Sequence, residues 1–259
     1  MTTSRFLLLT AFALTACGGS DKGSDSSAEE SPDATTDGGD GDGDTDEEEP
    51  AIEPDYPSGS PTGCDLTGTS YQLDFTVARV LQPEALGPVL ADAIGSDLAI
   101  GISAQTDTTV STVLALTSDG VQDLCTPSVQ PPEGSWVDPV FTVGPADVSV
   151  DISGTVATLS SFQFTAGAAA SCTAIESGVF QTDLDARLLG EAIGGTLGSE
   201  DPDEMCAVLV TLGAACEPCT SDDAPYCVKL VVDQLSASDR GTPLQVVTET
   251  DILDNADCG

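Results

Sequence analysis

The sequence predicts a mainly β folded domain, either a barrel or a sandwich, over residues 63–259. Two or three short helices and several stabilising disulfides are expected in it. Three observations predict it. Apolar and polar residues alternate along several short runs, which is the period of a half-buried strand. Clusters of Gly, Pro and Asp separate these runs, as turns do. Finally, this part of the chain holds an even number of cysteines. The alternative is an α+β fold whose helices cover one face of a sheet.

The expected strands are spread over the whole of this domain. In residues 71–79 the odd positions are apolar until Arg79, so one face of this strand is expected to be buried. In residues 156–164 the phase of the alternation shifts near Ser160 and Ser161, which indicates a β-bulge. The other expected strands are residues 98–104, 110–116, 148–152, 179–184, 228–235 and 244–247.

Three short helices are expected, at residues 88–94, 186–193 and 201–213. The third has the clearest signals. Asp201 can cap the helix, Pro202 suits its first position, and the two acidic residues that follow favour the positive end of the helix dipole. Gly213 ends it. Its apolar face consists of Met205, Val208, Leu209 and Leu212.

The first 17 residues have the layout of an export signal. Arg5 is followed by residues 6–16, which are uncharged and largely apolar. This run is too short to span a bilayer, for which about 20 residues are needed. It ends in Leu14-Thr15-Ala16-Cys17, which two glycines follow. This tetrapeptide resembles the lipobox of bacterial lipoproteins.

The resemblance implies that residues 1–16 are a cleaved signal peptide and that Cys17 becomes an N-terminus acylated with fatty acids such as palmitate. Two or three acyl chains anchor a protein stably, whereas one chain binds reversibly. Gly18 stands where an Asp commonly retains such lipoproteins in the inner membrane. The resemblance therefore implies an outer-membrane anchor, with the protein facing the periplasm or the exterior.

Residues 18–62 predict a disordered acidic tether. They contain 15 acidic residues and a single lysine, and such low hydropathy with high net charge cannot offset the entropic cost of ordering. Asp40, Asp42 and Asp44 have the first three spacings of a calcium-binding loop, but Thr45 stands where that loop requires glycine. We therefore expect a weak, diffuse association of Ca²⁺ with the tether rather than a specific site.

The eight cysteines of the domain predict four disulfides, because an even count in an exported domain is typical of a disulfide framework. Those between residues 206 and 227 are expected to pair among themselves. A disulfide between Cys64 and Cys258 would close the longest loop. Alternatively, Cys125 and Cys172 each form a disulfide with one of these two terminal cysteines. The CxxC of residues 216–219 lacks the βαβ context of a redox motif, and an oxidising compartment disfavours zinc. The set is Cys64, Cys125, Cys172, Cys206, Cys216, Cys219, Cys227 and Cys258.

Composition excludes several classes of function. The chain has no histidine, which excludes Ser-His-Asp and Cys-His catalysis and histidine metal sites. Its net charge of −38 repels phosphate backbones and excludes nucleic-acid binding. The motifs of hydrolase nucleophiles, phosphate-binding loops and dinucleotide sites are missing. We therefore expect a protein without a cofactor that is not an enzyme.

Asp183 and Asp185 are the remaining candidates for chemistry. They lie two residues apart on an expected strand, so they project from one face. Paired carboxylates can hydrolyse glycosides or hold a divalent cation. With 29 acidic residues in the domain, pairs at this spacing are also expected by chance.

The scarce cations and the single tryptophan are candidates for binding. Arg79, Arg187, Lys229 and Arg240 are the only cations of the domain, so each is expected to pair with a carboxylate; an anion-ligand site is the alternative. Trp136 lies in a proline-rich stretch. It is expected to plug the end of a barrel rather than anchor a partner.

Three functions remain open at this stage. The first is a lipid-anchored envelope protein with a non-enzymatic binding or structural role. The second is a carrier of a small apolar ligand in a barrel, in a cavity lined by residues such as Leu73, Phe75, Phe162 and Phe164. The third is a histidine-free hydrolase that uses carboxylates. A carrier should copurify with its ligand, and a hydrolase should need Asp183 or Asp185.

Overall fold

The computed structural model describes residues 53–88, 97–152, 155–188 and 201–258. The expected signal peptide, the expected lipidation site Cys17 and most of the tether lie outside these residues, as do most of the helices expected at 88–94 and 186–193. The chain divides into two units, Met1–Glu49 and Pro50–Gly259. The described strands and helices all lie in the second unit.

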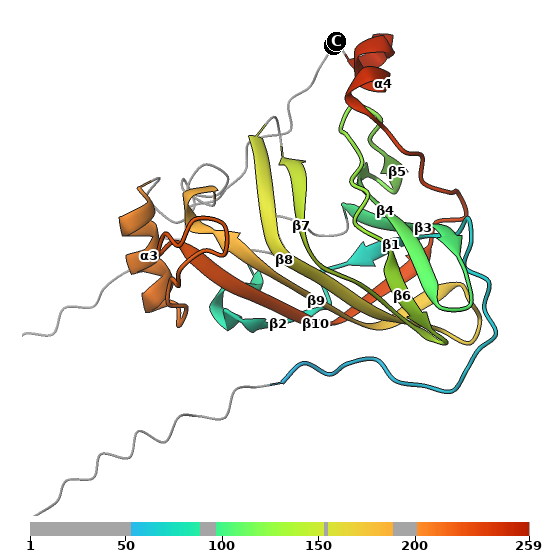
Figure 1. Ribbon diagram of the computed structural model, residues 1–259, viewed down its shortest axis with the longest axis horizontal. Helices are drawn as coiled ribbons and strands as arrows, with labels where there is room; N and C mark the ends of the chain where they lie inside the picture. Colours follow the sequence, from blue (N-terminus) through green and yellow to red (C-terminus); the bar gives the residue numbers. More distant parts are fainter. Residues whose placement is uncertain (1–52, 89–96, 153–154, 189–200, 259) are drawn as a thin grey trace, which may run out of the picture. The chain divides into compact units, whose positions relative to one another are not determined.

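This unit is a closed antiparallel barrel of eight strands (Figure 1). Neighbours around the barrel follow the order of the chain, and β10 returns to pair with β1, which closes the sheet. Two further short strands, β2 (Arg79–Gln82) and β5 (Val121–Gln122), pair with β10 and β4. The predicted mainly β class is confirmed, in its barrel form. The eight strands are β1 (Ser70–Asp74), β3 (Leu98–Gln105), β4 (Thr109–Ser118), β6 (Gly134–Val137), β7 (Val140–Ile152), β8 (Thr155–Ala168), β9 (Ala174–Asp185) and β10 (Cys227–Asp239).

One of the expected strands is shorter than predicted, and one is wrong. The run at 71–79 is interrupted after Asp74, whose carboxylate accepts hydrogen bonds from the backbone N–H and the hydroxyl of Thr76 and so forms a local turn. Residues 244–247 do not pair as a strand. Leu244 instead packs on the outer wall of the barrel, where a Cβ added to Gly101 would lie 3.2 Å from the Cβ of Leu244.

The bulge expected near Ser160 and Ser161 is confirmed. The register between β8 and β9 shifts after Ser160, and Ser161 has a φ of 53°. On the other side of β8, Gly144 of β7 has a φ of 86°, and a Cβ there would lie 2.1 Å from the carbonyl oxygen of Phe162. Glycine is therefore required for β7 and β8 to approach each other so closely.

The barrel interior is largely apolar and contains several aromatic rings in contact with one another. The ring of Phe180 on β9 lies edge-on to those of Phe162 and Phe75, at centroid distances of 5.6 and 6.2 Å. A second edge-on pair, Phe141 and Phe164, has its centroids 5.8 Å apart. Such pairs stabilise a core by about 0.5–1.5 kcal/mol beyond their buried area.

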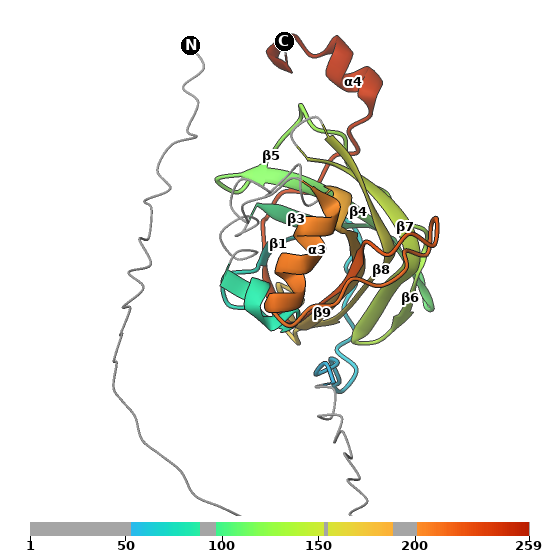
Figure 2. The ribbon, with the colours of Figure 1, turned by 90° about the vertical axis from the view of Figure 1, so that its left-hand side faces the viewer.

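Helix α3 (Pro202–Thr211) lies across one end of the barrel, as Figure 2 shows in a view onto that end. The side chain of Asp201 accepts hydrogen bonds from the first free N–H groups of the helix, and Pro202 occupies its first turn. This expected helix is confirmed. Met205 and Leu209 are buried in a second, smaller core, whose other buried members are Leu86, Ala186, Ala214 and Val228.

A short C-terminal helix was not expected from the sequence. Helix α4 (Glu249–Asp254) begins with a capping box, in which the side chains of Thr248 and Asp251 each accept a hydrogen bond from the other residue's backbone. It buries none of its side chains. Across the described ranges, no helix has the length and apolar character needed to cross a membrane.

The four expected disulfides are confirmed. They join Cys64 to Cys172, Cys125 to Cys258, Cys206 to Cys216 and Cys219 to Cys227. The bond between Cys64 and Cys258 is wrong, and the alternative, in which Cys125 and Cys172 each take one of these cysteines, is correct. The physical reason is the position of the chain ends: Cys64 lies beside Ala169 in the β8–β9 turn, whereas Cys258 lies beside Leu124 after β5.

Residues 53–63, here called the strap, are ordered on the outer wall of the barrel, although the sequence placed residues up to 62 in a disordered tether. The N–H of Asp55 donates to the carboxylate of Asp233 at 3.1 Å. The N–H and hydroxyl of Thr62 donate to the carboxylate of Asp138 at 2.9 and 2.8 Å, which lowers the pKa of Asp138. The folded domain therefore begins inside the expected tether.

Candidate functional site

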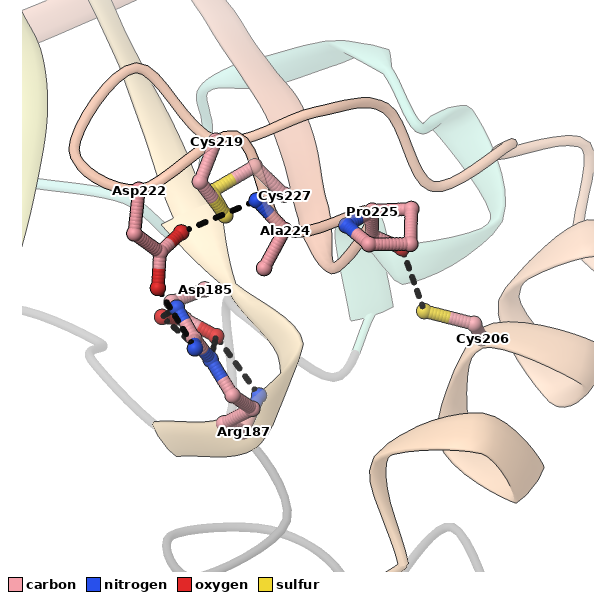
Figure 3. Close-up of polar contacts among 8 residues, drawn as sticks. All are labelled: Asp185, Arg187, Cys206, Cys219, Asp222, Ala224, Pro225 and Cys227. Atoms are coloured by element: carbon pink, nitrogen blue, oxygen red, sulfur yellow. Dashed lines mark hydrogen bonds and ion pairs between the residues drawn. A yellow bond between two sulfur atoms is a disulfide. The ribbon is translucent and has the colours of Figure 1, made fainter.

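Arg187 is the centre of a polar cluster just after β9 (Figure 3). Its Nε lies 2.9 Å from both carboxylate oxygens of Asp185, and its Nη2 lies 2.6 Å from one of them. Its Nη1 donates to Asp222 at 2.8 Å. Both oxygens of Asp185 are thus engaged by one guanidinium, which makes these charge-assisted hydrogen bonds.

The cluster continues to helix α3 through an aromatic ring. The guanidinium carbon of Arg187 lies 5.5 Å from the ring centroid of Tyr226, within the range of a cation–π contact. The hydroxyl of Tyr226 donates to Asp203, in the first turn of α3, at 3.0 Å. We call Asp185, Arg187, Asp203, Asp222 and Tyr226 the Arg187 cluster. It joins the end of β9, the start of β10 and the helix that covers this end of the barrel.

The electrostatics of the cluster favour the charged forms of the ion pair. The hydrogen bonds that Arg187 donates to Asp185 and Asp222 raise the pKa of Arg187, and the bond to Asp222 lowers the pKa of that carboxyl. The pKa of Tyr226 is raised because its hydroxyl donates to an anionic carboxylate. At neutral pH the arginine is therefore charged, and its two carboxylate partners neutralise it.

Two disulfides lie near the cluster, and Figure 3 shows the one between Cys219 and Cys227. The bond between Cys219 and Cys227 closes a short loop in which Asp222 accepts a hydrogen bond from the N–H of Ala224 at 3.1 Å. The two cysteines of the CxxC, at 216 and 219, belong to different disulfides. Within the described part of the chain, no group of three or more Cys, Asp or Glu side chains is placed to hold a metal ion.

Asp183, the other carboxylate of the candidate pair, is not part of the cluster. It lies opposite Lys229 in the register of β9 and β10. The sequence did identify Arg187 and Asp185, but it missed Asp203, Asp222 and Tyr226 as their partners. No local pattern could have found them, since the contacts depend on the path of a loop and on the docking of α3.

A second ion pair lies on the outer wall. Arg79 of β2 donates from Nε and Nη2 to the two oxygens of Asp233 on β10, at 2.9 and 2.5 Å. The side chain of Asp233 is completely buried, whereas that of Arg79 is 46% exposed. Because Arg79 and the N–H of Asp55 hydrogen-bond to the carboxylate, the pKa of Asp233 lies below its usual range, although burial opposes this effect.

The lowered pKa of Asp233 predicts a contribution to acid unfolding. A carboxylate with a depressed pKa in the folded state stabilises the fold above its unfolded pKa of about 4, and this stabilisation is lost as the pH falls through the folded value. We expect Asp233→Asn to reduce the loss of unfolding free energy between pH 7 and pH 3, measured by urea titration. The exposed Asp107→Asn is the control. An unchanged acid slope in the Asp233 variant would contradict the assignment.

The residues expected to line a ligand cavity are all inside the barrel. Leu73, Phe75, Phe162 and Phe164 are at most 5% exposed. Trp136, which the sequence predicts as a plug at the end of a barrel, is buried in this interior and lies on β6.

Thr112 on β4 is a polar residue of the same interior that the sequence did not reveal. It alternates with Val110 and Leu114, which belong to the interior core, so it faces the same way. It is 3% exposed, and its hydroxyl has no hydrogen-bond partner among the described residues. Leaving a buried hydroxyl unpaired costs about 1–3 kcal/mol.

No known protein family, curated protein or solved structure matches this chain. The assignment of function therefore depends on the chain's own residues.

Proposed function

We propose that the chain is a lipid-anchored protein of the cell envelope, with a non-enzymatic binding or structural role, and that its barrel is presented at the end of an acidic tether. The observation that carries the proposal is the way in which hydrogen bonds and a disulfide attach the strap to the barrel. The chain that would come from the anchor is hydrogen-bonded to Asp233 and Asp138. It is then fixed by the disulfide between Cys64 and Cys172. An N-terminal segment that is cross-linked to the barrel in this way suits a domain that is anchored through its N-terminal end.

The filled interior supports a rigid scaffold. Edge-on rings lie at contact distance from each other across several strands, and an eight-stranded barrel is just wide enough for side chains to fill it. The candidate carboxylate Asp185 has both oxygens bonded to Arg187. A general base there would first have to give up this ion pair, which supports a role without catalysis.

A second candidate function is the carrier of a small apolar ligand, and the unpaired hydroxyl of Thr112 favours it. A mostly apolar ligand with one polar group could satisfy this hydroxyl inside the barrel. Such a ligand would need the aromatic rings to move, because they occupy the same interior.

Native mass spectrometry of the exported protein distinguishes the two functions. A scaffold is expected to show the mass of the mature, acylated chain with four disulfides and no further bound molecule. A carrier would show an added small mass that denaturation releases and that Thr112→Val reduces. The exposed Ser103→Ala is the matched control, since it removes a hydroxyl outside the interior core.

The anchor is tested separately. We expect Cys17→Ser to move the protein from the membrane fraction to the soluble fraction, since the thiol is the site of the expected acylation. The measurement is fractionation of cells followed by immunoblotting. Ser20→Ala, three residues further on, is the control and should leave the protein in the membrane fraction. Unchanged partitioning of the Cys17 variant would contradict the anchor.

A further inference from the structure

Arg240 differs from the other arginines of the barrel. Arg79 and Arg187 are bonded to carboxylates. The guanidinium of Arg240, just after β10, donates instead to two backbone carbonyl oxygens, those of Gly120 at 3.0 Å and Thr242 at 3.4 Å. No carboxylate pairs with it among the residues that the structure describes. In a chain with 44 acidic residues and six cations, a described arginine without an ion pair to a carboxylate indicates a use for its charge.

The guanidinium of Arg240 also keeps unused donors. An arginine has five N–H groups, and the described acceptors take two of them. Its Nε is buried and has no partner within the described chain. Burial also lowers the pKa of Arg240, because the charge is withdrawn from water. A buried charged donor without an acceptor is costly, and because Nε itself is closed off from solvent, a ligand can reach only the Nη donors that the two carbonyls leave free.

Arg240 lines a pocket on the outer wall, between the β4–β5 turn and the C-terminal segment. The pocket has a volume of about 200 Å³. Gln122 fixes its two sides to each other, since its amide donates to the carbonyl of Gln245 at 2.7 Å and accepts from the N–H of the same residue at 2.8 Å. Val121, Leu124 and Pro243 supply apolar surface, and none of the lining residues is acidic.

We propose that this pocket binds a small monocarboxylate with a short apolar substituent. The carboxylate would accept hydrogen bonds from Arg240, whose planar fork matches its geometry. The substituent would lie against the three apolar side chains. A single negative charge is favoured over a dianion because the chain's net charge of −38 repels anions in proportion to their charge. The site depends neither on the anchor nor on the barrel interior, so the proposed function can fail while this site holds.

The side-chain NMR signals of arginine provide the test. The chain has four arginines, so the ¹H–¹⁵N spectrum of the exported protein in mild detergent contains few Nε–H signals. We expect propionate to shift the Arg240 signal saturably and to leave those of Arg79 and Arg187 unchanged. Inorganic phosphate at equal concentration should bind at least tenfold more weakly. Absence of a saturable shift with propionate would overturn the proposal, and equal or tighter binding of phosphate would overturn the ligand class.

Two variants complete the test. We expect Arg240→Gln to weaken propionate binding at least tenfold. Lys229→Gln removes an exposed cation from β10 and is the matched control for net charge, so its affinity should stay within twofold of the unsubstituted chain. Equal affinity in the two variants would overturn the assignment to Arg240. If Arg240→Gln does not fold, the spectrum of the unsubstituted chain still decides the question.

Discussion

Replacing both Cys64 and Cys172 with alanine is expected to lower the free energy of unfolding by about 5 kcal/mol. The two cysteines are 108 residues apart, and the loss of a cross-link over so long a loop returns a large conformational entropy to the unfolded chain. Urea titration at neutral pH, followed by circular dichroism, measures the effect. Unfolding is expected to remain a single transition, since the barrel strands themselves are unchanged.

The pair Cys206 and Cys216 provides the matched comparison. These cysteines are 10 residues apart, and the same relation gives a loss of about 3 kcal/mol for replacing both with alanine. Equal losses for the long and the short loop would contradict the entropic explanation.

In the variant without the Cys64–Cys172 bond, the strap should also be held less firmly on the barrel. Its remaining contacts include hydrogen bonds from Asp55 and Thr62 to carboxylates of the barrel, and such bonds contribute about 1 kcal/mol each. Limited proteolysis within residues 53–63 is therefore expected to be faster than in the unsubstituted chain. Replacing Cys125 and Cys258, whose disulfide holds the C-terminal end of the chain, should leave the rate of cleavage in the strap unchanged.

What the sequence predicted correctly has local causes. The alternation along residues 71–74 and 148–152, which lie in β1 and β7, comes from the pleat of the strand itself. The start of α3 at Pro202 follows from the chemistry of Asp201 and the residues just after it. The number of disulfides follows from the cysteine count and an oxidising compartment.

What the sequence did not reveal depends on residues far apart in the chain. The strap is polar and has no period, and it is ordered because distant carboxylates accept its hydrogen bonds. The alternation at residues 244–247 was misleading because apolar side chains there pack onto the outside of a wall instead of pairing in it. The same holds for the cations: scarcity predicted ion pairs, which Arg79 and Arg187 form, but only the fold shows that Arg240 faces carbonyl groups.

Phe180→Ala is expected to lower the free energy of unfolding by about 3–5 kcal/mol, the usual cost of removing a large aromatic side chain from a core. The side chain is 8% exposed and lies edge-on to two other rings, so its removal loses buried area and leaves a cavity in the middle of the barrel. Val137→Ala, at a side chain 73% exposed, is the control and should change stability by less than about 0.5 kcal/mol.

The same variant decides what the barrel interior is for. If the rings fill it, benzene should bind to Phe180→Ala, because an engineered apolar cavity accepts such a molecule, and should not bind to the unsubstituted chain. The measurement is the rise in unfolding temperature with benzene concentration, since a ligand that binds only the folded state stabilises it. Benzene binding of equal strength to both proteins would mean that the rings of the unsubstituted chain already move apart to admit an apolar ligand. The interior would then be a binding site that contains Thr112, and the carrier would replace the scaffold as the function of the barrel.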